Sequence, residues 1–179
     1  MKIINSLRDE SNLAGLNLIL IIPAIACGNF PFADVTNFNS IDVSSIDLET
    51  YTKWIPIQHT LDTGELKEES EIGDQGPLHK YSIECVIPKD YIYRHQQFQE
   101  LLQLDHLVIA KDNNDQYRLI GYTEDVFYNK GMQVKWKFSS GKGSKGFNGY
   151  QLTFYFESNR KALPVTGMDS LEIETAFLV

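Results

Sequence analysis

Two stretches late in the chain, MQVKWKF at 132–138 and GYQLTFYFE at 149–157, decide the fold class. Apolar and polar residues alternate along both stretches. Val134 and Phe138 fall on one side of the first, and Leu152 and Phe156 on one side of the second. A period of two is typical of strands with one buried and one solvated face. The two stretches therefore predict a sheet that packs one face against a core.

Other segments predict further strands and one helix. We expect Pro56 to mark a strand at the edge of a sheet, and residues 90–104 to form an amphipathic helix, because their apolar residues recur at helical spacing. The apolar run within residues 5–22 fits a buried strand or a packed helix equally well. The prediction is a mainly β (α+β) fold, an antiparallel β-barrel or sandwich with one packed amphipathic helix and long excursion loops. The remaining strands are expected at 51–61, 80–87, 106–112, 116–122 and 171–179.

A length of 179 residues suits a single β-rich domain spanning 1–179. Around the body of this domain we expect an N-terminal arm at 1–27 and extended loops at 28–50, 62–77 and 139–148, which are rich in Gly, Asn, Ser and Asp. A loop as long as 28–50 inside a compact domain is usually functional. We therefore expect these loops to reach neighbouring molecules.

Charge is distributed unevenly along the chain. The formal net charge is −8, residues 34–74 alone contribute −8, and residues 130–161 contribute +6. An acidic chain is not typical of a duplex-binding module, which needs a surplus of Lys and Arg. The plain interpretation is that both segments are solvated surface. The sharper one is that the acidic segment of one copy meets the basic segment of the next, which builds rings or tubes. Candidate intersubunit contacts are Glu65, Glu68, Glu69, Glu71, Lys142, Lys145, Phe30 and Phe32.

No pattern in the chain predicts catalysis, so we expect no enzyme activity and no catalytic residues. The string from Gly141 to Gly146 matches G-x-G-x-x-G, but it leads into a strand, whereas a dinucleotide site needs a helix there. The four histidines lack metal-ligand spacing, and two cysteines are too few for a disulfide framework. We therefore expect no cofactor-binding residue, no metal ligand and no cofactor.

The run 16–26 followed by Cys27 also looks superficially like a bacterial lipoprotein signal. Asp9 in the leading segment and Ala24, where such signals usually place Leu, argue against this interpretation. The run is also interrupted by Pro23 and shorter than a membrane span of about 20 residues. If the run is such a signal, the protein is a surface lipoprotein, lipidated at Cys27, that binds glycans through exposed aromatic side chains. This is the alternative function. Its candidate stacking residues are Trp54, Trp136, Tyr150 and Tyr155.

Three stretches carry a resemblance to known proteins: LAGLNLILIIPAIACG at 13–28, LVIAKDNNDQYRLIGY at 107–122 and NGYQLTFYFESNRKALP at 148–164. Together they resemble small proteins encoded among the neck and tail structural genes of Bacteroides-type tailed phages and prophages. The resemblance covers most of the chain in order, and its motifs are diffuse and contain no catalytic residue.

This resemblance implies a non-enzymatic virion protein, a ring or tube subunit of the phage neck or tail that connects portal to tail and helps form the DNA conduit. The implied partners are copies of the protein in a ring, neighbouring portal, neck or tail proteins, and double-stranded DNA that passes through a lumen without sequence recognition. No membrane partner is implied, and the implied location is the virion, assembled in the host cytoplasm. Reversal of Lys142 and Lys145 to Glu is expected to weaken assembly while leaving the monomer folded.

Overall fold

The computed structural model of the protein describes residues 14–28, 40–49, 52–73, 76–88, 94–122, 131–141 and 148–173. Its strands are β1 (Leu16–Pro23), β2 (Ile41–Asp42), β3 (Ile55–Pro56), β4 (Glu65–Gly73), β5 (Gly76–Pro88), β6 (His106–Asp112), β7 (Tyr117–Ile120), β8 (Gln133–Ser139), β9 (Gly149–Ser158) and β10 (Leu163–Thr166). Its helices are α1 (Arg94–Leu101) and the 3-10 turns η1 (Ala24–Ala26), η3 (Val43–Ser45) and η4 (Met168–Ser170).

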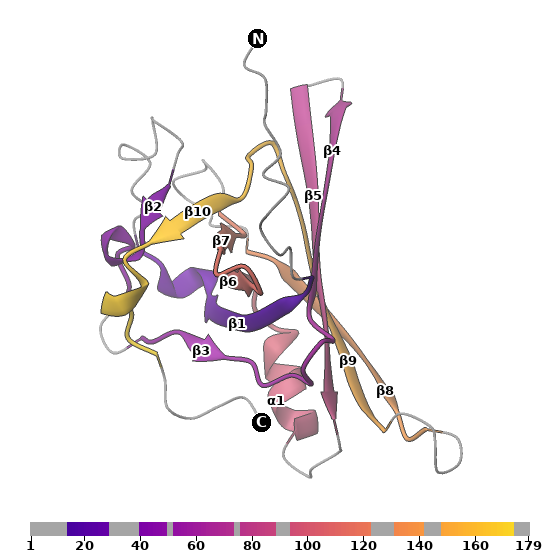
Figure 1. The fold of residues 1–179 in the computed structure, drawn as a ribbon. Coiled ribbons are helices and arrows are strands. Elements are labelled where there is room, and N and C mark those ends of the chain that lie inside the picture. The colour runs from indigo at the N-terminus through magenta and orange to yellow at the C-terminus, as the bar shows by residue number, and fades with distance from the viewer. Residues whose placement is uncertain are drawn as a thin grey trace.

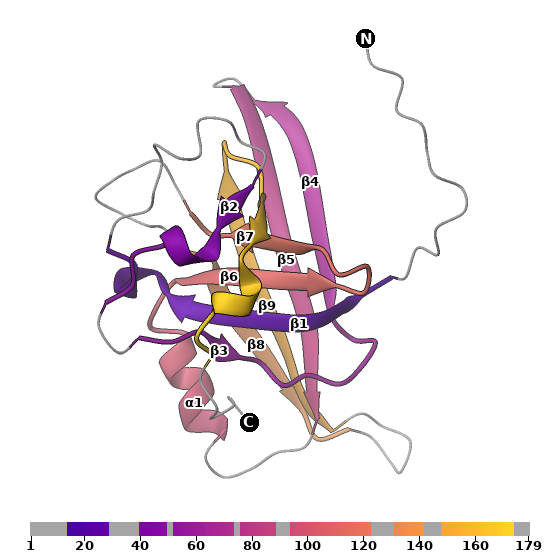
Figure 2. The ribbon, with the colours of Figure 1, turned by 60° about the vertical axis from the view of Figure 1, so that its left-hand side comes forward.

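The strands form two sheets that pack face to face. One has six strands in the order β2-β10-β7-β6-β1-β3, and the other has four in the order β4-β5-β9-β8. Strands of the two sheets cross rather than run alongside one another (Figure 2). All pairings within the sheets are antiparallel except β2 with β10, which is parallel. The predicted mainly β sandwich with one α-helix is therefore confirmed, and the described strands close no barrel.

The core between the sheets follows the predicted alternation. Ile83 and Phe154 from the four-stranded sheet and Ile19 and Val108 from the six-stranded sheet are completely buried there. Burying each such side chain contributes about 1.5–3 kcal/mol. The alternating strands at 132–138 and 149–157 thus direct their apolar side chains where the sequence predicts.

A second core lies on the opposite face of the six-stranded sheet. Leu20 and Leu107 point into it, and Ile41 and Trp54 from the covering segments close it. Since β1 is buried on both faces, its sequence is a continuous apolar run without period two. This double burial decides between the strand and the helix that the sequence left open for the apolar run within 5–22, in favour of a strand over Leu16–Pro23.

The helix α1 covers the end of the four-stranded sheet (Figure 1). Phe98 and Leu101 are buried, and the Phe98 ring lies 4.5 Å from that of Tyr150 between centroids. The Trp136 ring packs against both of these rings. The amphipathic helix predicted over 90–104 is therefore present, with described bounds of Arg94–Leu101.

Two predicted segments differ from the structure. The arm predicted at 1–27 is wrong for its second half, because β1 is an interior strand between β6 and β3. The loop predicted at 62–77 is wrong as well: β4 pairs with β5 throughout, from Glu65 opposite Glu84 to Gly73 opposite Gly76. Both faces of β4 carry charged residues, so backbone pairing rather than hydrophobic alternation makes it a strand.

The other two predicted loops are only partly described. Within 28–50 the chain forms β2 and η3, whose Ile41 and Val43 are buried, while residues 29–39 lie outside the described residues. Within 139–148, residues 142–147 lie outside them too. The strand predicted at 171–179 is described only to Ile173, which forms a parallel bridge with Trp54.

Candidate functional site

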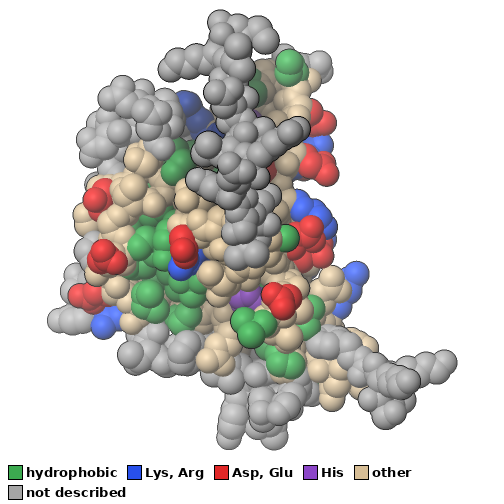
Figure 3. Space-filling view, viewed as in Figure 1, with side chains coloured by type: hydrophobic (Ala, Val, Ile, Leu, Met, Phe, Trp, Pro, Cys, Tyr) green, Lys and Arg blue, Asp and Glu red, His purple; other side chains and the backbone are tan. Residues whose placement is uncertain are grey.

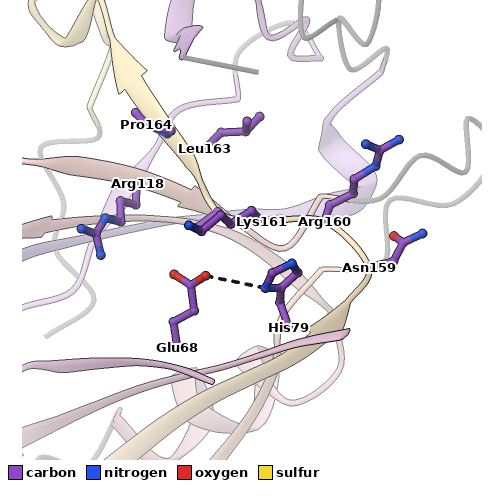
Figure 4. A pocket seen from close by; sticks show the side chains of 9 residues that line it. Glu68, His79, Arg118, Asn159, Arg160, Lys161, Leu163 and Pro164 are labelled. Atoms are coloured by element: carbon purple, nitrogen blue, oxygen red, sulfur yellow. Dashed lines mark ion pairs between the residues drawn. The ribbon is translucent and has the colours of Figure 1, made fainter. Parts of the chain in front are cut away.

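A groove of about 550 Å³ opens between the two sheets where the β4–β5 ribbon leaves the body of the sandwich (Figure 4). The groove is lined by residues of β4, β5, β7, β10 and the connection from β9 to β10. The lining residues are Glu68, His79, Arg118, Asn159, Arg160, Lys161, Ala162, Leu163 and Pro164.

The ribbon wall of the groove carries a carboxylate and an imidazole. Glu68 and His79 lie on the face of the ribbon that, further along, packs Ile83 into the core. His79 Nδ1 lies 3.7 Å from Glu68 Oε1 and 2.7 Å from Ser70 Oγ. A catalytic triad uses one ring nitrogen for the nucleophile and the other for the carboxylate. Here both contacts meet the same nitrogen, so the three residues lack triad geometry.

The opposite wall carries cations. Arg118 pairs with Ala110 across β6 and β7, and both positions belong to the side of the sheet that faces the ribbon. Lys161 reaches the groove from the β9–β10 connection, and the two side chains lie across from Glu68 and His79 (Figure 4). Arg118 and Lys161 are both exposed. The groove therefore has an acidic wall and a basic wall, with cations in the majority.

Two buried tyrosines fix the β9–β10 connection over the groove. The Tyr81 hydroxyl donates to the Arg160 carbonyl at 3.2 Å and accepts from the Ala162 amide at 2.8 Å. The Tyr122 hydroxyl donates to the Lys161 carbonyl. Burial raises the pKa of Tyr81 above its usual range and that of Tyr122 to about 12. Both hydroxyls therefore remain protonated donors, which holds the cationic segment in place.

The charges that line the groove suit binding of an anionic group. Exposed cations above one carboxylate suit weak contact with an anionic group, since exposed ion pairs contribute about 0–1 kcal/mol. Among the described residues no cluster of three His, Cys, Asp or Glu side chains is placed to hold a metal ion.

The outer face of the β4–β5 ribbon is the second candidate surface. Acidic and basic side chains follow one another along this margin of the molecule (Figure 3). Lys67 lies 3.0 Å from Glu65, and Lys80 lies 2.7 Å from Glu71. The ribbon extends past the body of the sandwich (Figure 1) and presents Ile72 near its tip with 93% of its surface exposed. A large apolar side chain at the end of a projecting ribbon is typical of a contact residue.

The predicted contact residues fall into three groups. Glu65, Glu69 and Glu71 lie together on the exposed outer face of β4. Glu68 is not with them, because period two turns it to the inner face, where its side chain is only 22% exposed. The structure thus separates Glu68 from the other three. The remaining four, Phe30, Phe32, Lys142 and Lys145, lie outside the described residues.

The lipoprotein alternative meets two structural obstacles. Lipidation at Cys27 requires removal of residues 1–26, which contain the interior strand β1. Cys27 itself is buried. Of the aromatic side chains considered for glycan stacking, Trp54 and Tyr150 are buried, which leaves Tyr155 as the most exposed. None of the described helices is both long enough and apolar enough to cross a membrane.

Sequence patterns missed the groove residues His79, Arg118 and Arg160. They are spread over 82 positions, from 79 to 160, and belong to no local motif. The sequence signal nearest to these residues was the strand predicted at 80–87. This predicted strand began one residue after His79, because Pro77 and three nearby glycines suggested a loop before it.

Comparison with known proteins adds no relative. No protein-family model, no curated protein and no solved structure matches the chain.

Proposed function

We propose that the protein is a non-enzymatic structural subunit of a virion, forming a ring or tube in the phage neck or tail between portal and tail. The observation that carries this proposal is the β4–β5 ribbon, which projects from the sandwich with a charged outer face and an exposed Ile72. A two-stranded ribbon is marginally stable in water by itself. Such an extension suits a protein that contacts neighbours better than one that acts alone.

The proposed partners are copies of the same chain and adjoining portal, neck or tail proteins. Double-stranded DNA is the proposed content of the lumen. The outer face of the four-stranded sheet carries Lys80 and Lys135 as well as Glu84 and Glu157. Tight, salt-dependent binding of a polyanion requires a surplus of cations. A face of mixed charge therefore suits a conduit along which DNA moves without being held.

Native mass spectrometry of the protein isolated from its source tests this proposal, because it reports subunit mass and copy number together. A closed ring or larger particle of intact chains is expected. Ile72→Asp at the ribbon tip is expected to reduce the assembled fraction about tenfold or more, because it places a charge in a contact. The matched control is Leu61→Asp, since Leu61 is also 80% exposed but lies off the ribbon.

A chain that stays monomeric at every concentration contradicts the proposal. A monomer that begins at a lipidated Cys27 replaces it with the surface-binding alternative. Equal loss of assembly in Ile72→Asp and Leu61→Asp removes the ribbon tip as the contact.

A further inference from the structure

We propose that neighbouring copies join edge to edge through their four-stranded sheets, with β4 of one copy beside β8 of the next. This inference rests on the proposed function, namely that copies of the chain assemble. It adds which strands meet, in which direction, and why the contact runs head to tail.

Both strands are edges. The order β4-β5-β9-β8 places β4 and β8 at opposite ends of the sheet. Single bridges to the other sheet, Leu16–Gly64 and His106–Met132, lie just before the two strands, and within their bounds no other described strand pairs with either one. Strands Glu65–Gly73 and Gln133–Ser139 are nine and seven residues long. Edges of this length present a row of backbone N–H and C=O groups that can pair with another chain.

The charges of the two edges are opposite. Strand β4 carries four Glu and one Lys, and β8 carries two Lys and no acidic residue. Two β4 edges repel one another, and so do two β8 edges, whereas β4 attracts β8. The charge pattern thus disfavours a symmetric pair and favours a contact between unlike surfaces. Repetition of such a contact closes a ring or extends a tube.

Individual side chains sharpen this argument. Glu65 and Glu71 already pair with Lys67 and Lys80 within one copy. Glu69 lies opposite Lys80 in the ribbon but forms no ion pair within 4 Å among the described side chains. The same holds for Lys137 and for Lys135, whose Nζ lies 5.4 Å from the centre of the Tyr155 ring. All three are exposed on the outer face of the sheet. Glu69 of one copy and the two lysines of the next are therefore the charges available for this contact.

Strand directions allow the sheet to continue through the contact. Each neighbouring pair in the order β4-β5-β9-β8 is antiparallel, so β4 and β8 also run in opposite directions. A rotation about an axis parallel to the strands keeps these directions and brings β8 of one copy antiparallel to β4 of the next. The registers place Lys135 level with Glu65, through Glu84 and Thr153, so bringing Lys135 opposite Glu69 also requires a shift of four residues, about 13 Å, along the strands. Rotation combined with this shift repeats as a tube. Since a continuous sheet preserves its faces, Glu69 and Lys135 then project from the same face with Cβ atoms about 4.5–5.5 Å apart.

Cysteine cross-linking between differently marked copies tests this arrangement. The native cysteines are buried, with Cys27 5% and Cys85 0% exposed, so the introduced thiols are the accessible ones. Copies with Glu69→Cys are mixed with copies carrying Lys135→Cys or Lys137→Cys under mild oxidation. We expect a disulfide-linked dimer in one of these mixtures and none in any variant alone. The matched control is Glu157→Cys, which is exposed on the same face but belongs to the interior strand β9.

Charge reversal provides a second readout. Lys135→Glu alone and Glu69→Lys alone are each expected to weaken assembly about tenfold, because each replaces an attraction by a repulsion. The two changes in one chain are expected to restore assembly. Both positions are exposed, so thermal unfolding of the monomer is expected to be unchanged in all three variants.

The outcomes separate this inference from the proposed function. Rings or tubes that form without any β4–β8 cross-link overturn the edge contact and leave the structural role intact. A disulfide between two Glu69→Cys copies overturns the head-to-tail direction. A chain that never assembles overturns both proposals, and failure of the combined reversal to restore assembly overturns the charge argument.

Discussion

Replacing the buried His106 with Leu is expected to remove a large part of the acid sensitivity of the fold. His106 begins β6, is 2% exposed and presents its ring edge-on to Phe154 in the core between the sheets. Its Nδ1 atom has no hydrogen-bond partner among the described residues. Burial disfavours the charged imidazolium and lowers the pKa of His106 from 6.5 to about 4.

The difference between the pKa of His106 in the unfolded and the folded chain sets the size of its effect on the free energy of unfolding. Between pH 6.5 and 4 the unfolded chain binds a proton at His106 and the folded chain does not, so this contribution to stability is complete above pH 6.5 and decreases as the pH falls. Each pH unit corresponds to about 1.4 kcal/mol, which amounts to about 3 kcal/mol by pH 4. His106→Leu has no such proton to bind, so its free energy of unfolding loses about 3 kcal/mol less over the same range.

Urea unfolding, followed by fluorescence of the buried Trp54 at pH 7.5, 5.5 and 4.5, measures this difference. The protein is kept dilute so that assembly does not add to its stability. His95→Gln is the control for the loss of a histidine, because His95 is exposed. The argument is refuted if His106→Leu and the unchanged protein lose equal stability between pH 7.5 and 4.5.

Two further substitutions test the packing that positions the groove and the sheets. Gly131→Ala places a Cβ against the backbone nitrogen of His106, so we expect the free energy of unfolding, measured in urea, to fall by about 1–3 kcal/mol. Gly73→Ala is the control, because its Cβ meets only an ordinary contact of 3.6 Å. Equal stability of the two variants contradicts the close approach at Gly131. Tyr81→Phe removes the hydroxyl that holds the β9–β10 connection, so we expect the free energy of unfolding to fall by about 1–3 kcal/mol. The control Tyr155→Phe, at an exposed position, is expected to change it by less than about 0.5 kcal/mol. An equally small change in Tyr81→Phe contradicts this role of the hydroxyl.

Prediction of strands from the sequence worked where one face of a strand is buried and the other is wet. The hairpin around the turn at 113–115 was predictable for another reason, since its first strand β6 is buried on both faces. There Asp112 Oδ1 accepts from the amides of Asn114 and Gln116, a local interaction that local sequence specifies. Prediction failed for β4, whose outer face is charged and whose inner face mixes Leu66 and Ile72 with Glu68 and Ser70. It left β1 ambiguous because both faces of β1 are apolar and buried. In both strands the period-two signal is absent.

The candidate groove could not be predicted because its residues meet only after the sheets pack. Glu68 and His79 come together through the register of β4 with β5, and Arg118 arrives from the other sheet. Sequence patterns grouped Glu68 with Glu65, Glu69 and Glu71 by their proximity along the chain. The pleat of the strand separates Glu68 from the other three.

The sequence by itself determined the fold class, the position of the helix and the acidic and basic character of the two sheet edges, because periodicity and charge are properties of local segments. Only the tertiary structure decided that the acidic segment is an edge strand, that the basic strand is the opposite edge of the same sheet, and that the apolar run is an interior strand. The physical reason is that pairing partners and register depend on contacts between segments distant in the chain. Burial and backbone hydrogen bonding across the whole fold select those contacts.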